Sequence, residues 1–228
     1  MNNDRETRIG LDGLTSEIEL TLISIIQGVA LSFLVERANS ALSLRDITPW
    51  LYVATGLLVI LIFWSRSVLH TLTLIRWPLE FVHNFLYITC ALGESILFTR
   101  LQSPRAWFAL SAVFAVVIWV LFVVDLRMIA ARCRDSTGEA GTRLCEAVRR
   151  DQWLNIKLLL PALFLFNAAC TIAISRWPEV FIVRGAHGYL IAISFAALAG
   201  YLVYVVRLYN RLAPLVGAVR NEWYASNA

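Results

Sequence analysis

The sequence predicts an all-α, polytopic integral membrane protein with six transmembrane helices. Hydrophobic residues make up 59% of the 228-residue chain and charged residues only 16%, below the roughly 25% that is typical of soluble domains. The chain also contains apolar runs of about 20 residues, the length that a helix needs to cross the hydrocarbon core. A soluble domain of this composition would have too little polar surface, so we expect lipid to cover its outside.

The apolar runs place the six spans in order along the chain. They fall at 17–36, from near Thr48 to 75, and at 79–100, 105–129, 153–175 and 187–209. Thr48 can cap the second span and Pro49 suits its first turn. Pro161 lies inside the fifth span, where a proline is expected to kink or loosen the helix.

The intervening segments complete the expected organisation. We expect a cytoplasmic N-terminal segment 1–16, membrane helices one to four over 17–129, a basic cytoplasmic loop 130–152, helices five and six over 153–209, and a cytoplasmic tail 210–228. The first sixteen residues are polar and lack the compact basic region of a cleaved signal, so the first apolar segment is expected to remain as a helix.

Positive charge predicts the orientation in the membrane. Every basic residue except Lys157 is an arginine, and with the N-terminus inside, fourteen of the 20 lie on the inner side and six on the outer. The outer six are Arg37, Arg45, Arg100, Arg105, Arg176 and Arg184. By the positive-inside rule both termini are cytoplasmic. We expect the cell membrane, most simply a bacterial inner membrane, and no nucleic-acid partner, because the arginines gather at the ends of apolar runs.

The segment 130–152 has two interpretations. It carries the basic residues Arg132, Arg134, Arg143, Arg149 and Arg150. It is either a solvated connector, whose flanks could extend the neighbouring helices, or a docking surface for a soluble cytoplasmic partner or anionic lipid. Cys133 and Cys145 also lie here, while Cys90 and Cys170 lie in apolar runs. Since no CxxC spacing occurs, neither a disulfide framework nor a structural zinc site is expected.

Two stretches of sequence suggest an internal repeat. Residues 71–81 read TLTLIRWPLEF and residues 171–181 read TIAISRWPEVF. The shared R-W-P would fall on opposite membrane sides in the two halves, as in transporters built from a 3+3 inverted repeat. The alternative is that arginine, tryptophan and proline are simply favoured at membrane interfaces.

The third span carries a polar seam. At 100° per residue, one arc of about 80° holds Glu80, His83, Tyr87, Cys90 and Glu94, flanked by Asn84. A charged carboxylate deep in the membrane costs at least ~2.5 kcal/mol, so Glu94 is expected to face protein or water. It could be a structural carboxyl bonded to Gln27 or Asn167, part of a cation or proton path, or catalytic. A polar seam also suits a subunit interface, and a homo-oligomer is expected.

Other polar residues of the spans have simpler interpretations. Glu80 and His83 form a Glu-x-x-His pair, but the second pair that a di-iron bundle needs is missing. We therefore expect no metal and no cofactor, and take Arg66 and His70 as partners of Glu80. Asp125 is expected at the membrane interface. Tyr201 and Tyr204 are expected to serve packing or anchoring.

The chain contains none of the nucleotide-binding, hydrolase or zinc-protease motifs of soluble enzymes. The seam favours a small cation or proton channel or carrier. The alternative is a non-transporting anchor or effector subunit of a stress, signalling or defence system, which docks a partner through 130–152. A membrane enzyme is the third possibility.

Overall fold

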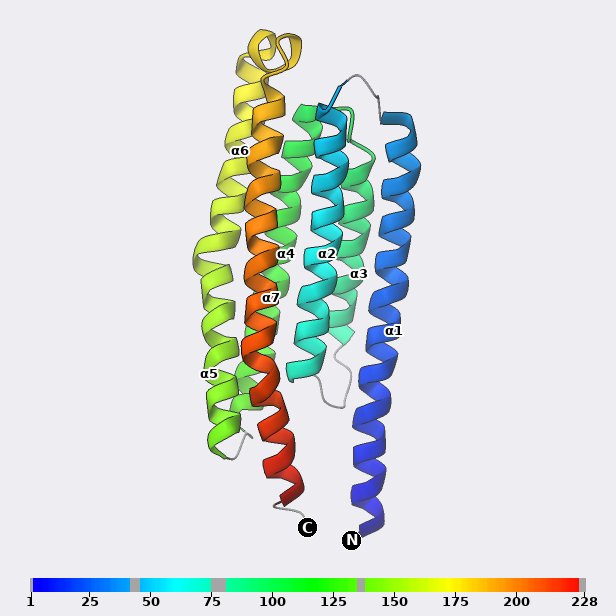
Figure 1. Ribbon diagram of the computed structural model, residues 1–228, viewed down its shortest axis with the longest axis vertical. Coiled ribbons are helices and arrows are strands. Elements are labelled where there is room, and N and C mark those ends of the chain that lie inside the picture. The colour runs from blue at the N-terminus through cyan, green and yellow to red at the C-terminus, as the bar shows by residue number, and fades with distance from the viewer. Residues whose placement is uncertain (1, 42–45, 75–80, 135–137, 226–228) are drawn as a thin grey trace.

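The computed structural model describes residues 2–41, 46–74, 81–134 and 138–225, and in these the chain is helical without strands. Long helices lie side by side and alternate in direction, and both termini lie at the same end (Figure 1). In chain order the elements are α1 (Asn2–Ala41), α2 (Thr48–Leu74), α3 (Phe81–Phe98), α4 (Pro104–Arg134), α5 (Glu139–Leu154), the π-helix η1 (Asn155–Leu159), α6 (Leu160–Arg176), the π-helix η2 (Glu179–Val183) and α7 (His187–Ala225).

Five stretches are long and apolar enough to cross a membrane. Within the described residues they are Leu20–Asn39, Thr48–Thr71, Pro104–Ala131, Glu139–Arg176 and His187–Val219. The prediction of an all-helical protein is confirmed, and the five stretches are compatible with a multi-pass membrane protein. The third predicted span corresponds to α3, whose apolar stretch Phe85–Phe98 is shorter, so the count of six stays a prediction.

The helices extend beyond the apolar runs. Segments 1–16, 130–152 and 210–228, expected as a terminal segment, a loop and a tail, are largely helical in α1, α4, α5 and α7. A helix that leaves the membrane keeps its internal hydrogen bonds in water, so the end of an apolar run marks the membrane boundary and not the end of the helix.

Helix packing gives no support to an inverted repeat. α2 packs along α7, α4 along α6, and α1 against both α2 and α3. A twofold axis that exchanges the two halves would pair α6 with α3 as α2 pairs with α7, yet α6 and α3 make no comparable contact within the described residues. The first R-W-P copy, at 76–78, lies outside these residues. The repeat is not confirmed.

Pro161 loosens its helix, as predicted. The rod from Glu139 to Arg176 changes to π geometry over Asn155–Leu159, immediately before the proline. In a π-helix the carbonyl of Ile156 would accept from residue 161, but proline has no N–H to donate. The indole N–H of Trp119 on α4 takes that place and donates to the Ile156 carbonyl over 3.1 Å.

The hairpin between α4 and α5 corrects the expectation for the cysteines. Cys133 and Cys145 form a disulfide, with their Cα atoms 5.8 Å apart. The chain reverses at Gly138, whose φ of +104° favours glycine, so the two antiparallel helices bring the cysteines together without a CxxC spacing. Glu222 of α7 accepts the Ala140 N–H over 3.3 Å and thereby caps α5.

Candidate functional site

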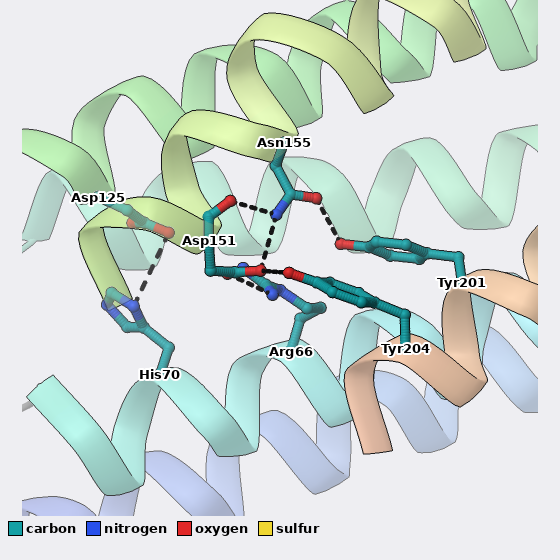
Figure 2. A network of polar contacts seen from close by, with 7 residues as sticks. All are labelled: Arg66, His70, Asp125, Asp151, Asn155, Tyr201 and Tyr204. Atoms are coloured by element: carbon teal, nitrogen blue, oxygen red, sulfur yellow. Dashed lines mark hydrogen bonds and ion pairs between the residues drawn. The ribbon is translucent and has the colours of Figure 1, made fainter. Parts of the chain in front are cut away.

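A cavity of about 430 Å³ lies inside the bundle. It is walled mainly by α2, α4, the α5–α6 rod and α7, and His83 and Tyr87 of α3 border it as well. Most of the lining is apolar, as in typical small-molecule sites. Toward the end of the bundle where the chain termini lie, charged and hydrogen-bonding side chains enter the wall (Figure 2).

A buried ion pair joins α2 to α5 in this wall. The Arg66 guanidinium lies 2.7 Å from Oδ2 of Asp151, and the two side chains are 11% and 4% exposed. Tyr204 of α7 donates its hydroxyl to Oδ1 of the same carboxylate over 2.7 Å. The guanidinium also lies over the Phe122 ring, 4.9 Å from its centroid. The hydrogen bond to the carboxylate and the contact with the ring offset part of the cost of removing the two charges from water.

Asn155 extends the network toward α7 (Figure 2). Its amide donates to the Asp151 carbonyl over 2.8 Å and to the Asp151 carboxylate over 3.2 Å. Its own oxygen accepts the Tyr201 hydroxyl over 2.6 Å. Tyr201 and Tyr204, which were expected to serve packing or anchoring, therefore also donate hydrogen bonds to this network. Tyr201 and Tyr204 are three residues apart, and Asp151 and Asn155 are four apart, so each pair lies on one face of its helix. This spacing was the signal in the sequence from which the network could have been predicted.

A second polar cluster joins α2, α3 and α4. The Asp125 carboxylate lies 2.8 Å from Nδ1 of His83 through one oxygen and 3.9 Å from Nδ1 of His70 through the other. The two imidazole rings stack, with centroids 4.9 Å apart. Asp125 is only 6% exposed, so it lies inside the bundle. Its expected depth at the membrane interface stays a prediction, because α4 runs on to Arg134 and a helix can continue beyond the membrane.

The seam on α3 faces the interior. His83, Tyr87, Cys90 and Glu94 are all buried, whereas Phe85 on the opposite face is 65% exposed. Helical periodicity thus placed these residues on the correct face. Glu80 and the Asn84 side chain lie outside the described residues. Arg66 and His70 contact Asp151 and Asp125, and their expected contact with Glu80 involves a residue outside the described part of the chain.

Glu94 lies at the far end of this seam and is 0% exposed. Gln27 of α1 lies beside both Glu94 and the Tyr87 hydroxyl. Gln27 was one of the two partners expected for Glu94 as a structural carboxyl. Neither carboxyl oxygen makes a hydrogen bond of good geometry within the described residues. Asn167, the other expected partner, donates to the Leu163 carbonyl of its own helix. The seam therefore ends in a fully buried carboxyl group whose polar neighbour is the Gln27 amide.

Comparison with known proteins gives no assignment: no family model, no curated protein and no solved structure matches the chain.

Proposed function

We propose that the protein moves a small cation, or protons, across the membrane through the interior of its helical bundle. The observation that carries the proposal is the complete burial of Glu94 without a hydrogen bond of good geometry in the described structure. A carboxylate in such a place is costly. Acidic groups inside membrane spans are rare and commonly mark pathways of ions or protons.

The surroundings of Glu94 supply neighbours for such a path. Tyr87 borders the cavity and lies near Gln27 and Glu94. A cation or proton that reaches the cavity at the Arg66–Asp151 end therefore meets polar side chains along α3 as it advances toward Glu94. The Arg66 charge is balanced by Asp151, so this ion pair adds no net charge to the cavity wall.

The proposal includes a topology. Six spans, with α3 as the shortest, leave both termini on one side, and the basic residues favour the cytoplasmic side of a bacterial inner membrane. A homo-oligomer is compatible with this arrangement and is part of the proposal. It does not depend on an inverted repeat.

Flux from proteoliposomes tests the proposal. The purified protein is reconstituted, a proton or K⁺ gradient is imposed, and a pH-sensitive or cation-sensitive dye inside the vesicles reports movement. Glu94→Gln keeps the shape of the side chain and removes the carboxylate, so we expect flux to fall about tenfold or more, an effect of about 1.4 kcal/mol on the barrier. Glu179→Gln, at an exposed position in η2, is the matched control and should transport like the wild type.

Stability must be measured on the same samples. Because no well-formed hydrogen bond of Glu94 is lost, thermal unfolding of Glu94→Gln in detergent should match the wild type. Wild-type vesicles without flux above empty liposomes would overturn the proposal. Equal flux in Glu94→Gln and wild type would remove Glu94 from the path and leave it as a structural carboxyl.

One observation supports the second candidate, a docking subunit. Arg134, Arg143, Arg149 and Arg150 are all exposed on the α4–α5 hairpin, while the Arg132 side chain lies outside the described residues. A soluble partner with an acidic surface, or anionic lipid, would fit this face. Replacing the four exposed arginines by glutamine should abolish a partner's co-purification from the native host and leave flux in vesicles unchanged.

A further inference from the structure

We propose that His70, His83 and Asp125 bind a divalent transition-metal ion such as Zn²⁺. The three side chains come from α2, α3 and α4, all are buried, and their donor atoms lie within 4.8 Å of one another. They also line the cavity, so an ion inside the bundle can reach them. The inference rests on the proposed function, because it names the class of cation that the path would carry.

The geometry is close to that of a metal centre. Zinc bonds of about 2.0–2.2 Å to nitrogen and oxygen place neighbouring tetrahedral donors roughly 3.3 Å apart. The separations of 2.8 Å and 3.9 Å from the Asp125 oxygens to His83 and His70 lie on either side of that value. Since the two rings are stacked at an interplanar angle of 15°, binding requires one imidazole to turn about its Cβ–Cγ bond. The bound ion then replaces the His83–Asp125 hydrogen bond.

The donor set selects the class of ion. Two imidazoles and one carboxylate suit zinc, cobalt, nickel or copper, whereas Mg²⁺ and Ca²⁺ prefer an all-oxygen shell. The cavity side leaves a position open for water or a passing ligand. Structural zinc sites are closed, whereas an open position lets a competing ligand reach the ion, so the ion can exchange.

Local charge also points to exchangeable binding. Asp125 is the anionic member of the cluster, so a divalent ion keeps a net positive charge after binding. Among the described residues, Arg66 and Asp151 line the same cavity, and their charges balance each other. An ion that is only partly compensated in a buried place is held weakly, as transport requires.

Cobalt spectroscopy tests the inference directly. The protein is purified without a histidine tag, stripped with chelator and titrated with Co²⁺, and visible ligand-field bands report coordination. We expect about one ion per chain and displacement by Zn²⁺. Asp125→Asn and His83→Gln should each weaken binding tenfold or more. His187→Gln is the matched control, because His187 is the third histidine of the chain and is not part of the cluster. It is the first residue of α7, and its Nδ1 lies 3.2 Å from the Tyr52 hydroxyl.

The outcomes are separable. Absence of ligand-field bands in a folded wild-type sample would overturn the inference, and so would equal binding by wild type, Asp125→Asn and His83→Gln. If Asp125→Asn or His83→Gln does not unfold cooperatively, that variant is not folded. Co²⁺ binding is then compared between the wild type, the remaining variant and His70→Gln. Proton flux without Co²⁺ binding would leave the proposed function standing and remove this inference. Co²⁺ binding that is lost in the cluster variants, without any flux of protons, K⁺ or Zn²⁺, would support the metal site and overturn the proposed transport function.

Discussion

Asp151 is the residue on which the polar interior depends most. Its carboxylate forms an ion pair with Arg66 on α2 and accepts hydrogen bonds from Tyr204 on α7 and from Asn155 one turn further along its own helix. Three helices are therefore fixed to one buried anion. Removing one donor from a buried charge costs more than the net contribution of the pair, because the charge stays behind without its partner.

Arg66→Met tests this dependence. Methionine matches much of the aliphatic length of arginine but leaves the Asp151 carboxylate without its cation, so we expect a loss of about 3 kcal/mol or more in unfolding free energy. Adding Asp151→Asn removes the charge and keeps an acceptor for Tyr204, so the double variant should recover most of that loss. Reversible denaturation in mixed micelles measures both.

The control is an exposed pair of the same chemistry. Arg143 and Glu139 are 2.6 Å apart, but their side chains are 67% and 77% exposed. Arg143→Met should change stability by about 0.5 kcal/mol or less. A similar small effect of Arg66→Met would show that the buried pair does not hold the helices together.

Sequence periodicity predicted the inward face of α3 but missed the Asp151 network. The seam residues lie on one helix, where spacing alone fixes their common direction. The partners of Arg66 are far away in sequence, and Asp151 was assigned to a loop because the apolar run starts after it. The same cause hid the His70–His83–Asp125 cluster, since its members come from three helices and no local spacing connects them.

The α5–η1–α6 rod depends on an interaction between elements. Pro161 cannot supply a donor for the Ile156 carbonyl, and Trp119 supplies one from α4. The missing N–H of Pro161 explains why the π segment does not continue past this point. The sequence could locate the proline. The compensating tryptophan became visible only with the packing of α4 against α6.

A double-mutant cycle tests this account. Trp119→Phe keeps the aromatic bulk but leaves the Ile156 carbonyl unsatisfied, and we expect a loss of about 1–3 kcal/mol. In a Pro161→Ala background the same change should cost clearly less, because the introduced alanine brings its own N–H. Trp153→Phe, at a tryptophan that contacts Lys157 on the exposed side, should show no such coupling. Equal costs of Trp119→Phe in both backgrounds would contradict the link to Pro161.

Within the described residues, large apolar side chains are exposed on the outside of the bundle while several charged groups are buried inside it. Leu165 and Ile172 on α6 are 64% and 62% exposed, whereas Glu94, Asp125 and Asp151 are buried. This is the distribution expected when lipid surrounds the bundle. Composition alone predicted this class. The number of crossings was harder to predict, because it depends on α3, the helix with the shortest apolar stretch.

Parity of the two termini decides the number of crossings. The 18 residues of α3 span about 27 Å at ~1.5 Å per residue, close to the roughly 30 Å hydrocarbon core. If α3 crosses, there are six spans and both termini lie on one side, in agreement with their common end of the bundle (Figure 1). If it does not, there are five and the termini lie on opposite sides.

We expect reporter fusions at the N-terminus, after Arg150 and after Ala228 to give the same signal, that of the cytoplasm, because fourteen of the 20 basic residues were assigned to that side. Opposite signals from the two termini would reduce the count to five, and a common outward signal would keep six spans but reverse the orientation.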